Sequence, residues 1–72
     1  MREHPVDYDP VKHPKHYTWI PGIECIDVVK YFNFCMGGAI KYIWRADRKG
    51  NKVEDLQKAI ELLQAEIKRE IG

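Results

Sequence analysis

Apolar residues in the middle of the chain recur at the spacing of an α-helix. At about 100° per residue, one side of such a helix carries the apolar positions Met36, Ala39, Ile40, Ile43 and Ala46, with Trp44 at its margin. The other side carries cations at positions i, i+4 and i+7, which are Lys41, Arg45 and Arg48. The pattern predicts a central helix that begins at Gly37, ends before Gly50 and has one apolar and one cationic side.

A second apolar series follows in the last third of the chain. Steps of three and four residues, as in the a/d seam of a coiled coil, separate Val53, Leu56, Ile60, Leu63 and Ile67. Asn51 is a favourable N-cap residue, and Glu54 three residues later completes a capping-box pattern. We predict a last helix from this cap to about Ile71. Ala59 and Leu62 widen its seam, so the helix is expected to pack on the chain's own body and on a second copy, which gives a homo-oligomer.

The first part of the chain differs from the rest because it holds all four prolines, Pro5, Pro10, Pro14 and Pro21. Each proline interrupts a regular helix, so residues 1–22 are predicted to form an extended arm. A short helix is then predicted from Ile23 to about Phe32, and its apolar face is Cys25, Ile26, Val29 and Phe32. The predicted fold is all-α, a small three-helix domain with its helical body over residues 23–72 and a Pro-rich N-terminal arm.

Length and charge narrow the possible classes of protein. A chain of 72 residues forms one domain, and a net charge of +1 gives no strong attraction to nucleic acid or to a membrane. So short a chain buries a modest core, which again favours oligomerisation. Its apolar runs are too short to span a membrane and no signal-peptide pattern occurs, so we expect a cytoplasmic protein. Cys25 and Cys35 lie among apolar neighbours and are expected to be free thiols.

The cationic side of the central helix suggests an anion site. Gly37 and Gly38 fall in the predicted first turn, where backbone N–H groups are unpaired and carry positive potential. Bare glycines, free N–H groups and cations together suit a phosphate group. The candidate phosphate ligands are Lys41, Arg45, Arg48, Lys49, Lys52, Gly37 and Gly38. The alternative is a solvated basic side on an ordinary core helix.

Aromatic residues in the arm suggest how a nucleotide would be held. Tyr17 and Trp19 offer flat faces on which a nucleobase can stack, and the neighbouring His16 can form a hydrogen bond to phosphate or ribose. The alternative for both aromatics is packing against the helical body, as is common in a small protein.

Three acidic residues complete the candidate site. Glu24 and Asp27 begin the first predicted helix, where carboxylates favour the helix dipole without any ligand. The functional alternative is that they bond to a ribose or base, or that they hold Arg45 or Lys41. Asp55 and the cation Lys58, both close to the turn at Gly50, can reach the same ligand. The candidate base and ribose ligands are therefore His16, Tyr17, Trp19, Glu24, Asp27 and Asp55.

Several kinds of chemistry are excluded by the residues present. The chain has no Walker A pattern and no serine, which excludes a P-loop kinase and a serine nucleophile. No Cys-x-x-Cys pair accompanies the histidines, so no metal site and no cofactor are predicted. A few cations on one helix give only a weak hold on nucleic acid, which argues against a nucleic-acid partner.

Four blocks of the sequence resemble one known family. In order they are His13-Pro-x-His16-Tyr17, Gly22-Ile-Glu24-Cys-Ile-Asp27-Val, Gly37-Gly-Ala-Ile-Lys41-Tyr42-Ile-Trp-Arg45-Ala-x-x-Lys49-Gly and Glu54-Asp55-Leu-x-Lys58-Ala. The resemblance runs from about Asp9 to Ile67 and is to the DUF3310 family, a phage-encoded family commonly labelled nucleotide kinase after that of phage T7. The usual family pattern has Gly-Asn where this chain has Gly37-Gly38, so one side-chain amide is missing.

The resemblance implies a phage protein that handles nucleotides in the cytoplasm of an infected bacterium. Phosphoryl transfer needs a second nucleotide site and usually a metal ion, and a chain of this length has little room for both. We therefore expect a protein that sequesters a nucleotide, such as a cyclic di- or oligonucleotide immune signal, and so counters host defence. One alternative is a metal-independent nucleoside monophosphate kinase. Another is an inhibitor of a host protein that acts through Leu56, Leu63 and Ile67.

Overall fold

The computed structural model describes residues 13–72, and the described chain is helical. A short 3₁₀ turn, η1 (Lys15–Tyr17), precedes three α-helices, which are α1 (Cys25–Val29), α2 (Phe34–Arg45) and α3 (Lys52–Ile71). The prediction of a small all-α domain with three helices is confirmed. The part of the predicted arm over residues 1–12 lies outside the described residues.

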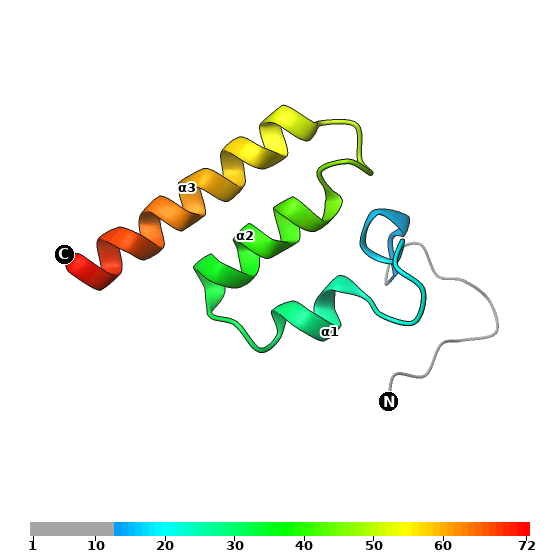
Figure 1. The fold of residues 1–72 in the computed structure, drawn as a ribbon, viewed down its shortest axis with the longest axis horizontal. Helices are drawn as coiled ribbons and strands as arrows, with labels where there is room; N and C mark the ends of the chain where they lie inside the picture. Colours follow the sequence, from blue (N-terminus) through cyan, green and yellow to red (C-terminus); the bar gives the residue numbers. More distant parts are fainter. Residues whose placement is uncertain (1–12) are drawn as a thin grey trace.

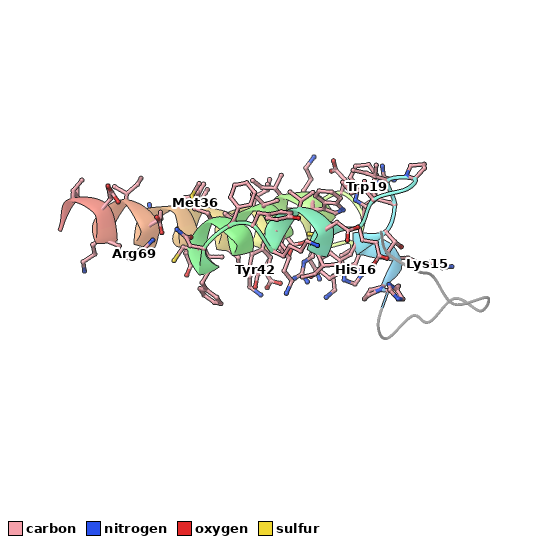
Figure 2. All side chains as sticks on the ribbon, turned by 90° about the horizontal axis from the view of Figure 1, so that it is seen from below. Lys15, His16, Trp19, Met36, Tyr42 and Arg69 are labelled. Carbon is pink, nitrogen blue, oxygen red and sulfur yellow. The ribbon has the colours of Figure 1, made fainter. Side chains whose placement is uncertain are left out.

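The three helices lie side by side in a single layer with α2 in the middle (Figure 1). α2 and α3 form an antiparallel hairpin, and α1 packs on the other edge of α2 (Figure 1). Seen edge-on, Met36 and Trp19 point to one side of this layer, whereas Tyr42 and His16 point to the other (Figure 2). The fold therefore presents two broad faces of different composition.

α2 begins three residues earlier than the sequence pattern predicted. The Asn33 side chain caps the helix, since its Oδ1 accepts a hydrogen bond of 2.8 Å from the Met36 N–H. Gly37 and Gly38 consequently lie in the second turn, and the Gly37 N–H already donates to the Asn33 carbonyl at 2.8 Å. The prediction that these glycines offer first-turn N–H groups was wrong, because a capping asparagine upstream was taken for an interruption.

The two glycines instead let neighbouring helices approach α2 closely. A Cβ on Gly37 would lie 3.2 Å from the Val29 carbonyl oxygen of α1, and one on Gly38 would lie 2.7 Å from Leu62 Cδ1 of α3. Each glycine thus marks a contact between α2 and one of its two neighbours.

α1 is shorter than the predicted helix over residues 23–32. Its start is fixed by Asp27, whose Oδ2 accepts a 2.8 Å hydrogen bond from the Glu24 N–H, so these two residues cap the helix as the dipole argument allowed. Beyond Val29 the chain turns, and the Phe32 N–H donates to the Val29 carbonyl at 2.9 Å. The predicted Pro-Gly turn before α1 is present, with Gly22 at a φ of +81°.

The predicted capping box at the start of α3 is absent. Asn51 occupies the N-cap position, but its side chain makes no capping hydrogen bond. The helix directs Asp55 and Ala59 inward, and both are buried. Ala59 and Leu62, which widen the apolar seam, pack on the chain's own body as predicted, since Ala59 is buried and Leu62 faces Gly38 of α2. The five residues of the seam itself lie to the side of this inward stripe and are exposed.

The described part of the arm packs on the helical layer, as predicted. The Trp19 Nε1–H donates a 2.9 Å hydrogen bond to the Trp44 carbonyl, and the two indole rings are 6.2 Å apart. Cys25 and Cys35 are free thiols, and burial raises the pKa of Cys25. Among the described residues, no helix has the length and hydrophobicity needed to cross a membrane.

Candidate functional site

The candidate site is built around Arg45, which connects the end of α2 to α3 and to the arm. Its Nε and one terminal nitrogen donate to Asp55 Oδ1 at 3.2 and 3.0 Å. Its other terminal nitrogen donates to the Tyr17 hydroxyl at 3.1 Å. Burial lowers the pKa of Arg45, but the bonds to Asp55 and Tyr17 outweigh burial and raise it, so the guanidinium stays charged.

Two lysines extend this positive charge along the same face of the layer. Lys41 Nζ lies 5.6 Å from the centre of the Tyr17 ring, and Lys58 Nζ lies 5.6 Å from the centre of the Tyr42 ring. The Arg45 guanidinium lies 4.8 Å from the centre of the same Tyr42 ring. Positions over aromatic faces help to hold these cations in place. Two of them also have acidic partners, since Arg45 pairs with Asp55 at 3.0 Å and Lys58 Nζ lies 3.9 Å from Glu54 Oε1.

The pKa of His16 reflects the electrostatic potential beside Arg45 and Lys41. Its ring lies 4.2 Å from that of Tyr17. Burial lowers the pKa of His16, and the positive charges of Lys49, Arg45 and Lys41 lower it further, while Asp55 raises it in part. The histidine is thus surrounded by cations that disfavour another positive charge. We call this group the cationic cluster and define it as His16, Tyr17, Lys41, Tyr42, Arg45, Lys49, Asp55 and Lys58.

A groove of about 500 Å³ opens beside the cluster between α2 and α3, within the size range of small-molecule sites. Gly37 and Gly38 form part of its lining. The remaining lining residues come from the end of α1 and from both helices of the hairpin, and they are Val29, Phe32, Asn33, Phe34, Lys41, Tyr42, Lys58, Glu61 and Leu62.

The groove differs in character between its two ends. Near the start of α2 it is lined by apolar and aromatic residues, among them Phe32, Phe34 and Leu62. One to two turns further along α2 it reaches Lys41 and Tyr42, which connect it to the cationic cluster. Such a groove can take a ligand with a flat apolar part and an anionic head.

Not all of the predicted residues are brought together. The structure gathers His16, Tyr17, Lys41, Arg45, Lys49 and Asp55 in the cationic cluster, with Gly37 and Gly38 in the adjoining groove. Arg48 lies beyond the end of α2 and stacks at 4.3 Å on the Trp19 ring, with which it lines a different pocket. The predicted cationic stripe of Lys41, Arg45 and Arg48 is therefore broken, because α2 ends at Arg45.

Three further predicted ligands lie elsewhere or have other partners. Lys52 pairs with Asp47 at 2.9 Å on the surface. Glu24 is buried against His13, with 2.8 Å between Glu24 Oε1 and His13 Nδ1, and Asp27 caps α1. Among the three predicted acidic residues it is Asp55 that holds Arg45, and the alternative in which Glu24 or Asp27 holds Lys41 stays a prediction.

Sequence reasoning missed the aromatic and polar lining of the groove. Tyr42 joins Arg45 and Lys58, yet it falls between the apolar and cationic sides of the predicted helix. Phe34, 85 % exposed, was assigned to a connecting segment. Phe34 follows once α2 is extended back to its Asn33 cap, because Phe34, Lys41 and Arg45 then lie on one side of the helix.

Metal-ligating residues do not gather in the described part of the chain, where no group of three or more His, Cys, Asp or Glu could hold a metal ion.

The family model described as a protein of unknown function (DUF3310) matches residues 11–64 of the sequence, which cover α1, α2 and most of α3. Neither curated proteins nor solved structures give a match to the chain.

Proposed function

The chain belongs to the DUF3310 family, and we propose that it binds a nucleotide in the groove between α2 and α3 and sequesters it. The observation that carries this proposal is the cationic cluster at one end of an aromatic groove. Lys41, Arg45 and Lys49 act together on His16, where the buried Asp55 is the acidic member of the cluster. Lys58 adds a charge over the Tyr42 ring and lies 3.9 Å from Glu54 on α3. A phosphate group supplies the negative charge that this arrangement lacks.

The two ends of the groove set the orientation of the ligand in this proposal. The base lies at the apolar end, where the exposed Phe34 and the neighbouring Phe32 offer stacking surfaces. The phosphate lies at the other end, within reach of Lys41 and Lys58. Glu61 lines the same groove and can accept a hydrogen bond from a ribose hydroxyl or a base amine.

The positions of the groove and of the Arg48 pocket on the described residues give no support to transfer of a phosphoryl group between nucleotides bound in these two places. In-line transfer requires donor and acceptor in one site. The pocket that holds Arg48 is lined by Trp19, which points to the opposite side of the layer from Tyr42 (Figure 2). A nucleotide there could not meet one in the groove. We therefore favour sequestration, with cyclic di- or oligonucleotide immune signals of an infected bacterium as the ligand class.

The test is to mix the protein with nucleotides and then to recover the bound ligand. The protein is incubated with a panel of cyclic dinucleotides, and separately with ATP and nucleoside monophosphates, and free ligand is measured after filtration. The protein is then denatured by heat and the released material is chromatographed. Depletion followed by intact release supports sequestration. Formation of ADP and a nucleoside diphosphate would establish the kinase instead, and no depletion of any nucleotide would refute the proposal.

Matched variants test the site itself. Lys58→Ala and Lys41→Ala each remove one charge beside the groove and are expected to weaken binding about tenfold, which corresponds to about 1.4 kcal/mol. Lys68→Ala on α3 and Arg48→Ala beyond α2 remove the same charge away from the groove and are expected to bind as the wild type does. Equal loss in all four variants would indicate a diffuse charge effect and would remove the groove from the proposal.

A further inference from the structure

The face of the layer opposite the groove is apolar. On α2 it carries Met36, Ile40 and Ile43, of which the last two line a pocket with Trp19 (Figure 2). On α3 the apolar seam belongs to the same face, because it lies on the other side of the inward-facing stripe from Lys58 and Glu61. We call this surface the apolar face and define it as Met36, Ile40, Ile43, Val53, Leu56, Ile60, Leu63 and Ile67.

Large side chains on this face stay in contact with solvent. Ile43, Ile60 and Ile67 are 55, 52 and 57 % exposed. The hydrophobic residues that are buried in the described chain are all small, namely Cys25, Ala39, Ala46 and Ala59. An amphipathic layer of helices normally buries its apolar face against a second layer, and the described residues supply only one. The apolar face therefore needs a cover that the described residues do not supply.

We propose that a second copy of this chain is that cover, in a two-fold dimer whose α3 helices lie parallel and side by side. The seam itself argues for this occupant. In heptad notation the a positions are the β-branched Val53, Ile60 and Ile67, and the d positions are Leu56 and Leu63. This distribution, with Ile or Val at a and Leu at d, is the one that favours two-stranded parallel association.

The charges around the seam are compatible with self-association. In a two-fold contact each surface patch meets its own copy, so any net charge in its centre would repel itself. The centre of the seam is uncharged, and the positions beside it on the outer edge are Gln57 and Gln64. Each amide both donates and accepts hydrogen bonds, so identical amides can pair across the axis.

Dimerisation through this face leaves the two grooves on opposite outer surfaces. Each groove then keeps the residues of its own chain, and a dimer binds one ligand per chain. The inference is independent of the proposed function, because the apolar face and the cationic cluster share no residue.

The experiment measures mass in solution by sedimentation equilibrium over a dilution series. We expect the wild type at twice the chain mass, with dissociation at low concentration. Ile60→Glu places a charge in the seam and is expected to give a monomer. Ala65→Glu places the same charge on the groove side of α3, away from the seam, and is expected to stay a dimer. A wild type that is monomeric at every concentration would overturn the proposal and leave the seam for a different protein.

A second variant keeps the test decisive if Ile60→Glu does not fold. In a Cys35→Ala background, Ile60→Cys should form an intermolecular disulfide on mild oxidation, because identical a positions face each other in a parallel pair. Ala65→Cys in the same background should stay unlinked. Crosslinking of both, or of Ala65→Cys alone, would show that the contact is not at the seam.

Discussion

The Arg45 guanidinium donates two hydrogen bonds to a single oxygen of Asp55, while the second oxygen, Oδ2, has no hydrogen-bond partner. Asp55 is 0 % exposed and is the largest fully buried side chain of the described residues. The α2–α3 hairpin is thus closed by an ion pair where most small domains have leucine or phenylalanine. This pair also sets the position of the guanidinium in the cationic cluster.

Removal of Asp55 should destabilise the fold strongly. Asp55→Ala leaves Arg45 without its ion-pair partner, and loss of one partner of such a buried pair costs about 3–5 kcal/mol. Asp47→Ala breaks the ion pair between Asp47 and Lys52, in which both side chains are exposed. This variant should change the free energy of unfolding by about 0–1 kcal/mol. Urea denaturation followed by circular dichroism measures both. Equal effects would contradict the role given to the buried pair.

A double variant separates stability from ligand binding. Arg45→Met with Asp55→Leu replaces the pair by apolar side chains of similar size, and such replacements are often neutral or stabilising. We expect the double variant to regain most of the stability lost in Asp55→Ala. If the proposed function holds, it should bind nucleotide more weakly than the wild type.

The two glycines of α2 should respond differently to alanine. Alanine favours a helix over glycine by about 1 kcal/mol. At Gly38 the new methyl group meets the end of the flexible Leu62 side chain, which can rotate away, so Gly38→Ala should be neutral or stabilising. At Gly37 it meets the Val29 carbonyl oxygen, which accepts the Phe32 N–H at 2.9 Å and is held in place. Gly37→Ala should therefore be the less stable variant in thermal unfolding, and the reverse order would contradict this account.

The helix caps give a second matched pair. Asn33→Ala removes the side-chain oxygen that accepts the Met36 N–H and should destabilise the protein by about 0.5–2 kcal/mol. Asn51→Ala removes a side chain that makes no capping bond and should change stability far less. Chemical denaturation of the two variants measures the difference. A larger loss in Asn51→Ala would contradict the observed cap geometry.

The same caps explain which parts of the fold could be predicted from sequence. Periodic apolar residues located all three α-helices, and α3 ends at Ile71 as expected. Helix starts were less predictable, because Asn33 and Asn51 look alike in sequence. Only the Asn33 side chain accepts a capping hydrogen bond, from the Met36 N–H, whereas the Asn51 side chain makes none. The error at Asn33 then shifted Gly37 and Gly38 into the wrong turn.

Within the candidate site, helical spacing could predict which residues of α2 share a side, but not what they face. Lys41 and Arg45 were correctly placed together, and Arg48 was lost where the helix stopped. The partnership of Arg45 with Asp55 and Tyr17 depends on the turn between α2 and α3 and on the path of the arm. Those are tertiary contacts that no local pattern contains.

His16 provides a pH-dependent test of the cationic cluster. Because its pKa in the folded protein is lowered from 6.5, the fold favours the neutral imidazole. Its contribution to stability is therefore present above pH 6.5 and is lost as the pH falls through the folded pKa. Thermal unfolding should show this decline in the wild type, and His16→Gln should reduce it.

Neighbouring charge should move the pKa of His16 in a definite direction. Lys49→Gln removes a cation that lowers this pKa, so the pKa should rise, whereas Lys52→Gln, whose lysine pairs with Asp47, should leave it in place. A phosphate-bearing ligand bound beside Lys41 should raise it as well, because negative charge stabilises the imidazolium. Proton NMR titration measures the pKa of the His16 imidazole in both variants and in the presence of ligand, and the His16→Gln variant assigns the signal. An unchanged pKa in Lys49→Gln would show that the cations do not act together at His16, and the phosphate end of the groove would then have to lie elsewhere.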